Sequence, residues 1–503
     1  MIRIETEQDP EVLRQVALLL DRENRKLHDR VAHLTRQLSQ LRGDDAKGLQ
    51  LELDALKEIL SRRERALFAD SSERRVHAHD KDQTTPHPAR RGHGPRPQPQ
   101  LPLIEKVHEL ADDQRRCDVC GGALKEWKGQ FEESEEITVV ERSFTVIKHR
   151  RKKYRCTCNA KVATAPGPVK LRPGARYSVP FAVEVAVAKY QDHLPLNRQV
   201  RQMAREGLNV DTQTLWDQIE AVAKHLQPSY EALKKRALDS ELVHADETGW
   251  RFLGKNSKKR WWAWSVLGPD AVYYRIAESR SAEAASHLLN GYQGIVMADG
   301  YSAYGVLARG QPSFKLVHCW AHVRRKFIEI EDNYPVPCAE IVDLIGQLYA
   351  VERLVPSVHL STIAQDKAEA LRLRAELRDK RSRRIMSSIH KWVFQQHPLP
   401  QCGLAKAIAY MTGMWKGLTA FLEDPCIPLD NNAAERALRN VVLGRKNHYG
   451  SHSRRGTEVA ALFYSLMESA LLCGIEPKSY LLRAAFDAIE KPGTVTLPHN
   501  LTN

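Results

Sequence analysis

The chain has 503 residues, nine of them cysteines, and its 76 Lys and Arg exceed its 62 Asp and Glu to give a net charge of +14. This length predicts roughly three or four domains, and the basic excess favours a polyanionic partner, usually nucleic acid, over a merely soluble basic protein. The cysteines are scattered and odd in number, which argues against a disulfide scaffold. The first residues are acidic, which argues against a secretory signal, and no run of roughly 18 apolar residues suggests a membrane helix. We therefore expect a cytoplasmic protein without a membrane partner.

Residues 10–69 are predicted to form a coiled coil with a leucine zipper. Two positions repeat every seven residues, occupied by Leu20, Leu27, Leu34 and Leu41 and, three residues earlier, by Ala17, Asn24, Val31 and Leu38. These are the d and a positions of a heptad, and an asparagine at an a position favours a defined register and a dimer. We therefore expect a homo-oligomer; a hairpin of antiparallel helices within one chain is the alternative.

Residues 70–103 differ in composition from what precedes them. Ser, His, Arg, Pro and Gly dominate, with six prolines between positions 86 and 102. Such a sequence cannot bury enough apolar surface to form a core, so we expect an extended, positively charged linker.

Residues 104–170 are predicted to be a small zinc-binding β segment. The pairs Cys117/Cys120 and Cys156/Cys158 flank β-patterned stretches at 137–140 and 144–147. Four thiolates suit tetrahedral zinc when a hairpin brings the two pairs together. The second pair is closer in sequence than is usual, which leaves open another ligand such as His149, or cysteines that stay reduced and bind no metal.

The basic run beside the second cysteine pair is a candidate DNA contact. Arg150, Arg151 and Lys152 follow one another, and consecutive cations of this kind suit phosphate binding. The alternative is a solvated strand edge.

Residues 171–239 are predicted to be helical with the outline of a helix-turn-helix. One helix begins near Pro195 and ends at Gly207, and a second begins after Asp211. A recognition helix with polar N-terminal residues would read double-stranded DNA; ordinary helical packing explains the pattern equally well.

Residues 240–335 are predicted to form the first part of a mixed α/β core. A strand carries Asp246, a hairpin turns at Gly268-Pro269-Asp270, a helix spans 281–289, and a strand at 294–298 ends in Asp299 before a further strand at 314–317. This order, with acids on the first and fourth strands, matches a ribonuclease-H-like sheet. Glu247 competes with Asp246, but alternation along the strand points it to the opposite face.

The rest of the chain is predicted to hold a helical insertion at 336–428 and the end of the core at 429–490. The insertion is basic and would either span DNA or present a solvated face (Arg372, Arg374, Arg378, Lys380, Arg381, Arg383 and Arg384). After it, Asp430 and Asn431 are expected to cap a helix that carries Glu435, and an amphipathic helix at 458–473 closes the fold.

Three acids in this order point to metal-dependent phosphoryl transfer on DNA. Two Mg²⁺ (or Mn²⁺) ions can activate an oxygen nucleophile and stabilise the leaving oxygen of a phosphodiester, and they prefer carboxylate ligands. We assign Asp246 to bridge both ions, Asp299 to hold one and Glu435 to hold the other. Cations near Glu435 are candidates for contacts to DNA phosphates (Arg436, Arg439, Arg445 and Lys446).

Several stretches carry a resemblance to a known family (His244-Ala245-Asp246-Glu247-Thr248, Ala298-Asp299-Gly300-Tyr301, Asn431-Asn432-Ala433-Ala434-Glu435-Arg436-Ala437-Leu438-Arg439, Gly444-Arg445-Lys446-Asn447, Phe68-Ala69-Asp70-Ser71-Ser72-Glu73-Arg74, Cys117-Asp118-Val119-Cys120-Gly121-Gly122 and Gly474-Ile475-Glu476-Pro477). Together, and in this order over nearly the whole chain, they closely resemble the transposase of the insertion sequence 66 family. The resemblance implies a bacterial DDE transposase that cuts and joins the ends of its element with Mg²⁺, acts at the nucleoid and in some elements needs accessory proteins. It places the catalytic acids on Asp246, Asp299 and Glu435.

Two short segments, residues 319–322 and 156–158, bear on how closely the chain follows the family pattern. The segment Cys319-Trp320-Ala321-His322 looks like the C-x2-H signature that follows the second acid in several DDE superfamilies; we favour helix packing over an ancillary metal or DNA contact. The family's second cysteine pair is commonly spaced C-x2-C, and Cys156-Thr157-Cys158 departs from this, which bears on zinc affinity but not on the catalytic acids.

Other functions fit parts of the same pattern. A non-catalytic protein could use the zinc segment, coiled coil and basic insertion to bridge DNA ends or repress transcription. A hydrolytic nuclease would use the same acids with water as the only nucleophile. Intact acids argue against the first, and a zipper that pairs two DNA ends favours transposition over the second.

Overall fold

The computed structural model describes residues 143–155, 162–254, 260–310, 314–355 and 364–501, with short pieces at 25–31, 33–35, 53, 56–57 and 123. Nearly all of these belong to one of the two compact units into which the chain divides, the unit that combines Met1–Leu67 with Ser143–Asn503. Residues 25–31 and 33–35 are helical, whereas the zipper pairing, the linker and the four cysteines of the predicted zinc site lie outside the described residues and stay predictions.

A short hairpin flanks the second cysteine pair. Strands β1 (Lys153–Arg155) and β2 (Val162–Thr164) pair antiparallel, so Cys156 and Cys158 fall in the connection between them. The β pattern at 144–147 is a wrong prediction: no strand forms there, and Val146 and Ile147 are 90% and 70% exposed. Propensity alone does not make a strand, because the backbone also needs a neighbouring strand to pair with.

Three helices follow at the predicted positions, namely α3 (Val179–Tyr190), α4 (Leu196–Arg205) and α5 (Thr212–Leu238). The side chain of Asp211 accepts a hydrogen bond from the Thr214 amide at 2.6 Å and caps α5 as expected. Gly207 has φ 86°, which glycine adopts without strain in the turn after α4. However, one side of α5 is buried along much of its length against α3, α15 and the sheet, and its exposed residues are Thr212, Gln213, Lys224, Glu231 and Lys235.

The centre of the molecule is a five-stranded mixed sheet with the order β5-β4-β3-β6-β7. Its strands are β3 (Leu242–Trp250), β4 (Trp261–Leu267), β5 (Val272–Ala277), β6 (Ile295–Ala298) and β7 (Lys315–His318). The first three form an antiparallel meander, and β3, β6 and β7 run parallel. The predicted turn joins β4 to β5, with the Gly268 amide donating to the Ala271 carbonyl at 2.9 Å.

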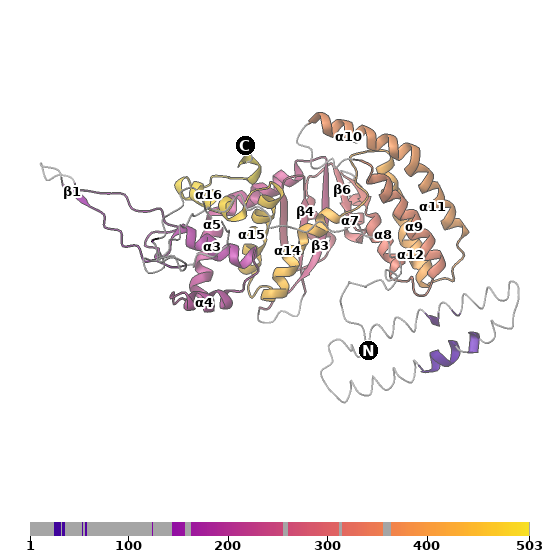
Figure 1. Ribbon diagram of the computed structural model, residues 1–503, viewed down its shortest axis with the longest axis horizontal. Helices are drawn as coiled ribbons and strands as arrows, with labels where there is room; N and C mark the ends of the chain where they lie inside the picture. Colours follow the sequence, from indigo (N-terminus) through magenta and orange to yellow (C-terminus); the bar gives the residue numbers. More distant parts are fainter. Residues whose placement is uncertain are drawn as a thin grey trace. The chain divides into compact units, whose positions relative to one another are not determined.

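Helices cover both faces and one edge of this sheet (Figure 1). Helices α6 (Ala282–Leu289) and α7 (Ser302–Gly310) pack on one face, and α14 (Asn432–His448) packs on the other, against β3 and β4. Helix α15 (Arg454–Leu472) lies along the edge strand β5. There the hydroxyls of Ser465 and Ser469 accept hydrogen bonds from the backbone amides of Tyr274 and Val272, each at 2.9 Å. These serines satisfy an edge that would otherwise be open to another chain.

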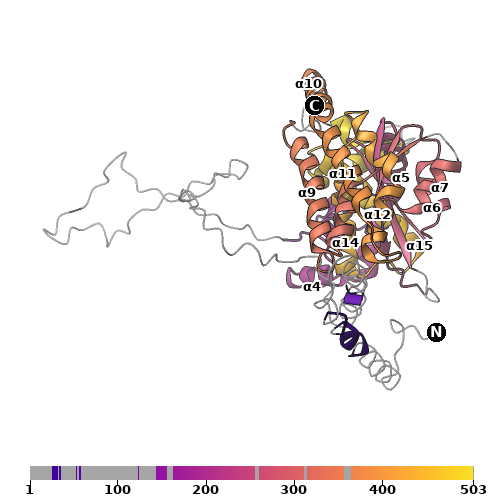
Figure 2. The ribbon, with the colours of Figure 1, turned by 90° about the vertical axis from the view of Figure 1, so that its right-hand side faces the viewer.

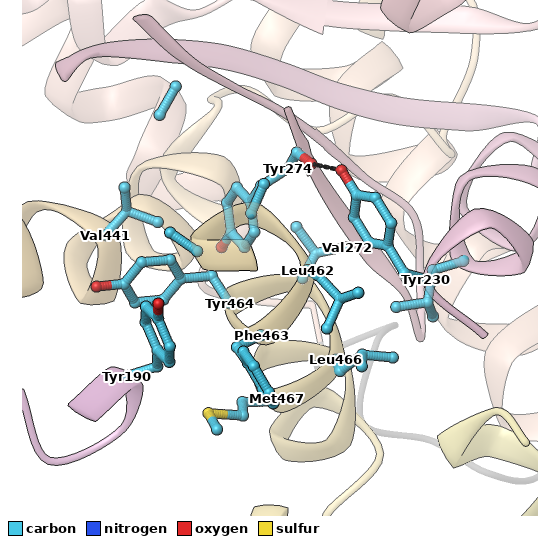
Figure 3. Packing of buried hydrophobic residues seen from close by; sticks show 14 of the residues in the cluster. Tyr190, Tyr230, Val272, Tyr274, Val441, Leu462, Phe463, Tyr464, Leu466 and Met467 are labelled. Atoms are coloured by element: carbon cyan, nitrogen blue, oxygen red, sulfur yellow. Dashed lines mark hydrogen bonds between the residues drawn. The ribbon is translucent and has the colours of Figure 1, made fainter. Parts of the chain in front are cut away.

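The main hydrophobic core lies between α15, the edge strand and the neighbouring helices (Figure 3). Tyr230 of α5 donates its hydroxyl to the Tyr274 carbonyl at 2.7 Å, and Tyr190 of α3 stacks on Phe463 with ring centroids 5.2 Å apart. The helix predicted to be amphipathic at 458–473 is instead buried on nearly all sides. Two of its polar positions, Ser465 and Ser469, bond to the sheet and Glu468 accepts from Asn440, so polar residues on α15 do not mark a solvent-exposed face. A further helix, α16 (Pro477–Glu490), and the turn η5 (Pro498–Leu501) close the chain.

A compact helical layer lies where the helical insertion is predicted, and α9, α11 and α12 are seen together in Figure 2. After α8 (Trp320–Ile328) it contains α9 (Pro335–Glu352), α10 (Ala364–Leu377), the π-helix η3 (Arg378–Ser382), α11 (Arg383–Gln395), α12 (Gly403–Gly413), α13 (Trp415–Thr419) and η4 (Ala420–Leu422). Its hydrophobic cluster continues into the sheet through Met297 and Val317.

Two of the insertion's arginines are not surface cations as predicted. The Arg378 side chain is 1% exposed; it forms a two-pronged ion pair with Glu352 at 2.7 and 2.9 Å and donates to the carbonyls of Phe421, Asp424 and Ile427. Arg374 also pairs with Glu352, at 3.4 Å. A composition count cannot separate such internal arginines from those on the surface.

No single helix within the described residues is long and apolar enough to cross a membrane; α15 and α16 satisfy that test only as a pair, bent by 118°.

The buried His448 makes the stability of the fold depend on pH. Burial, and secondarily the charge of Lys189, lower the pKa of His448 to about 3 from the usual 6.5, so the unfolded chain binds a proton that the folded chain excludes. The contribution of neutral His448 to the free energy of unfolding is therefore complete above pH 6.5 and decreases as the pH falls below 6.5. We expect the unfolding free energy of the wild type to fall by about 1 kcal/mol more than that of His448→Gln between pH 7 and 5.5. Urea unfolding at both pH values measures this, and parallel losses in the two proteins would contradict it.

Candidate active site

The first acid lies in the middle of the sheet. The register of β3 with β6 pairs Val243 with Val296 and His244 with Met297, and continuing it by two residues sets Asp246 level with Asp299. Burial, followed by the negative charges of Asp299, Glu247 and Glu435, raises the pKa of Asp246 to about 8. The predicted acids are therefore close enough to act on one another electrostatically.

The second acid ends β6 at a turn that needs glycine. Asp299 accepts a hydrogen bond from the Tyr301 amide at 2.9 Å, and the Tyr410 hydroxyl from α12 donates to the Asp299 carbonyl. Between them Gly300 has φ 91°, and a Cβ at this position would collide with the sulfur of Met414. The insertion thus packs directly on the turn that presents the second carboxylate.

The third acid comes from the first turn of α14. Glu435 lies 3.4 Å from His322 Nε2 and 3.4 Å from the Arg325 guanidinium, both on α8. Its side chain is 29% exposed, so it remains accessible beside the buried pair of strands. Sequence reasoning missed Arg325, which the spacing along α8 places one turn after His322.

Asn431 joins the strand that carries Asp246 to the start of α8 and to the helix that carries Glu435. Its side-chain amide donates to the Ala245 carbonyl at 2.9 Å, its side-chain oxygen lies 2.9 Å from His244 Nδ1, and its backbone amide donates to Cys319 Sγ at 3.1 Å. The side chain is fully buried. We predicted Asn431 as a helix cap, but its side chain makes no cap bond to α14; it fixes the helix that carries Glu435 against the strand that carries Asp246.

Replacing Asn431 by alanine is expected to lower both stability and activity. The change leaves the Ala245 carbonyl and a ring nitrogen of His244 buried without a partner, which costs about 2–3 kcal/mol. Asn432→Ala is the matched control, because the side chain of Asn432 bonds only locally, to Asp430 at 2.8 Å, and should cost under about 1 kcal/mol. Equal unfolding free energies for the two variants in urea would contradict the role given to Asn431.

Glu247 points away from the other acids, as alternation predicted. Its side chain is fully buried on the opposite face of β3, where it accepts hydrogen bonds from Arg280 at 2.6 and 2.9 Å and from the Tyr304 hydroxyl at 3.0 Å. A carboxylate with these partners is already neutralised. Glu247 therefore forms a structural ion pair with Arg280 beneath the site.

The donor chemistry of the acids fits a divalent cation. In the part of the chain that the structure describes, the Glu247 amide donates to Asp246 at 2.8 Å, while burial and then neighbouring negative charges raise the pKa of Asp246; a bound cation would offset the effect of those charges. Among the residues that the structure describes, no three His, Cys, Asp or Glu side chains already converge as metal ligands. Each acid is instead turned to its own local partner, and hard carboxylate oxygens are what Mg²⁺ prefers.

The C-x2-H segment contributes to packing, in line with the sequence expectation. Cys319 is buried at the start of α8, and its sulfur accepts a hydrogen bond from the Asn431 amide. Burial raises the pKa of the Cys319 thiol to about 12. A thiol held in its neutral form is a poor metal ligand. Its partner His322 contacts Glu435, so both members of the segment bear on the position of the third acid.

The predicted DNA-contacting cations are mostly on the surface. Exposed positions include Arg436, Arg439 and Lys446 on α14 and Arg150, Arg151 and Lys152 before the hairpin. Arg445 is half-buried and donates to the Gly249 carbonyl and, at 3.3 Å, to Thr248 Oγ1. Arg151 donates from Nε of its guanidinium to the Ala165 carbonyl at 2.6 Å.

Comparisons with known proteins agree on one family. Residues 174–459 match the family model described as Transposase IS66 family, and residues 114–159 match the zinc-finger binding domain of transposase IS66. Two relatives from Sinorhizobium fredii (strain NBRC 101917 / NGR234) are the uncharacterized proteins y4jD, 32% identical over 76% of each chain, and y4qI, 30% identical over 75% of this chain and 71% of its own. The second match covers all four cysteines of the predicted zinc site.

Proposed function

The chain belongs to the IS66 family of transposases, and on that premise we propose that it binds the ends of an insertion element and catalyses Mg²⁺-dependent DNA cleavage and strand transfer. Two observations support the proposal: the strand register sets Asp246 level with Asp299, and the charges of Asp299 and Glu435, after burial, contribute to the raised pKa of Asp246. The strand order β5-β4-β3-β6-β7, with β4 antiparallel to its neighbours, supports a ribonuclease-H-like core.

The three acids divide the work of the site. Asp246 would contact both metal ions, Asp299 one and Glu435 the other; Mg²⁺ or Mn²⁺ bound there would supply the charge that activates the attacking oxygen and stabilises the leaving one. The residues around the acids hold them in place: Tyr410 and Gly300 fix the Asp299 turn, and Asn431 fixes α14. These contacts hold the backbone that carries the acids, and the carboxylates would turn from their present partners to bind the ions.

The remaining segments bring DNA to this site. The zinc-finger segment would hold Zn²⁺ through Cys117, Cys120, Cys156 and Cys158 and, with Arg150, Arg151 and Lys152, contact the element ends. Arg436, Arg439, Arg445 and Lys446 follow Glu435 along α14 and would bind phosphates of the reacting strand. The coiled coil would pair two copies and hence two DNA ends, with accessory proteins of the element as further partners on nucleoid DNA in the bacterial cytoplasm.

The direct test is a cleavage and strand-transfer assay on the full chain. Purified protein is mixed with duplexes that carry the ends of its own element and with a supercoiled target plasmid, in Mg²⁺ or in EDTA. Nicked ends and joined products that require Mg²⁺ are expected. Nicks without joining would favour a hydrolytic nuclease. DNA binding without any chemistry, even after the element's other proteins are added, would favour the non-catalytic bridging or repressor protein and overturn the proposal.

A further inference from the structure

Helix α4 presents several arginines and no acid. Its ten residues, Leu196–Arg205, include three arginines and contain neither Asp nor Glu. Arg198, Arg201 and Arg205 are all exposed, and their spacing of three and then four residues places them on one side of the helix. We call these three residues the α4 arginines.

Exposed arginines on other helices of the same unit have acidic neighbours at helical spacing. Arg383 pairs with Asp379 at 2.9 Å, and Arg483 pairs with Asp487 at 3.0 Å, each four residues away. The α4 arginines instead follow one another at positions where like charges repel, and such pairs weaken a helix. An anion bound along this side of α4 would relieve the repulsion.

The other side of α4 is fixed to the body of the protein. Gln199 is 2% exposed, and its side-chain amide donates to the carbonyls of Leu194 at 3.0 Å and Val185 at 3.3 Å. Met203 is equally buried, and its carbonyl accepts from the Leu208 amide at 2.8 Å. This side packs on α3 and α5, and Figure 1 shows α4 at the margin of the described unit. The α4 arginines therefore extend from a helix already in place, which lowers the ordering cost of binding.

Charge distinguishes α4 from the helix that follows it. The sequence pattern gives the reading of DNA to α5, which begins after Asp211 and has no Lys or Arg before Lys224. The exposed residues of its first turn, Thr212 and Gln213, are neutral. Contacts between cations and phosphates supply essentially all of the binding to DNA that is independent of sequence. In this pair of helices only α4 offers those cations at the turn between them.

The length of the arginine row matches the backbone of duplex DNA. Arg205 comes seven residues after Arg198, which at about 1.5 Å per residue is roughly 10 Å along the helix. Successive phosphates of one strand are spaced about 3.4 Å along the duplex axis, so the row extends over about three of them. Guanidinium groups suit such a contact because they present paired donors to phosphate oxygens.

We propose that the α4 arginines bind neighbouring phosphates of one strand of duplex DNA. On this inference α4, rather than α5, provides the charged contacts of residues 171–239 to the ends of the element. The inference rests on the proposed function, which supplies the DNA. Contacts of this kind position the duplex and carry no sequence information.

The salt dependence of DNA binding tests the α4 arginines without requiring catalysis. The full chain and the variant Arg198→Gln/Arg201→Gln/Arg205→Gln are titrated in EDTA against a mixed-sequence DNA duplex over a range of salt concentrations. Each phosphate contact contributes about −0.9 to the slope of log K against log salt, so the slope should become less steep by about 2.7 in the variant. Lysine at the same three positions keeps the charge and should restore the slope; a lysine variant that behaves like the glutamine variant would contradict a contact made through charge.

A charge-matched control removes three cations elsewhere. Lys478→Gln/Arg483→Gln/Lys491→Gln changes residues of α16 and its C-terminal cap and is expected to leave the slope within about 0.5 of the wild type. Equal slopes for the α4 variant and the wild type, with both folded by circular dichroism, would overturn the α4 surface, and so would equal losses in the two triple variants. A slope that changes with an RNA duplex but not with DNA would assign the surface to RNA and also overturn the proposal.

The same proteins, assayed in Mg²⁺, separate this inference from the proposed function. Cleavage of element ends by the wild type, together with equal slopes for the α4 variant and the wild type, would overturn the α4 surface alone. A reduced slope in the α4 variant of a protein that never cleaves would support the α4 surface and overturn the proposed function.

Discussion

Asp246→Asn is expected to abolish Mg²⁺-dependent nicking and joining while DNA binding is retained. Asparagine keeps the size of the side chain but removes the charge, so the site loses the one ligand assigned to both ions. We expect a loss of roughly 10³-fold or more in rate, equivalent to about 4 kcal/mol in the activation barrier. Single-turnover cleavage of an end duplex, beside a filter-binding assay in EDTA, measures both properties.

Two further variants test whether the loss of cleavage is specific to Asp246 or follows from removing any nearby carboxylate. Asp239→Asn makes the same change seven residues earlier, at a side chain that is 74% exposed, and should leave cleavage unchanged. Glu247→Gln alters the neighbouring carboxylate, which pairs with Arg280 on the other face of the strand; it should reduce stability and retain Mg²⁺-dependent chemistry. Full cleavage by Asp246→Asn, or its loss only in Glu247→Gln, would show that the acids are wrongly assigned.

Arg378→Met is expected to lower the unfolding free energy by about 3–5 kcal/mol. Methionine fills a similar volume, but it leaves Glu352, which is 16% exposed, with only the longer ion pair to Arg374 at 3.4 Å, and it removes the donor to the carbonyls of Phe421, Asp424 and Ile427. Removing one member of a buried ion pair is costly for this reason. Because the freed segment leads into Asn431 and α14, cleavage should fall as well. Urea unfolding monitored by tryptophan fluorescence measures the loss.

Arg383→Met and the double variant Arg378→Met/Glu352→Met are the controls. The Arg383 side chain is 44% exposed and pairs with Asp379 and Glu423 at the surface of the same insertion, so its removal should cost no more than about 1 kcal/mol. The double variant removes both members of this ion pair but also takes the carboxylate partner from Arg374, so it should recover only part of the loss. If Arg378→Met were no worse than Arg383→Met, the buried ion pair would not be what holds the insertion to α14.

Local patterns were sufficient to predict the elements that carry the candidate site. Alternation around Asp246 predicted both its strand and the opposite direction of Glu247, because side chains on a strand point to its two faces in turn. The glycine after Asp299 and the Gly268-Pro269-Asp270 segment predict turns, because glycine and proline favour the backbone conformations that turns need. The strand order then follows from the connections, since the fold brings the end of β6 beside the middle of β3.

The contacts between distant segments could not be predicted in the same way. Asn431 looked like a helix cap because asparagine favours that position, but its partners are Ala245 and His244, almost two hundred residues earlier. Arg378 looked like a surface cation because most arginines are, and only the insertion's packing reveals Glu352 beside it. The β pattern at 144–147 failed because strand pairing depends on a partner rather than on propensity.

The separation of the acids along the chain has a consequence for how the protein is made. Asp246 and Asp299 leave the ribosome early, and residues 300–434, including the whole helical insertion, must be synthesised before Glu435 appears. At about 5–20 residues per second this takes on the order of ten seconds. During that interval the nascent chain has two of the three acids assigned to the site and lacks Glu435, so on the proposed assignment it is inactive. The same assignment makes a product that ends within the insertion inert and restricts cleavage to chains that extend past Glu435.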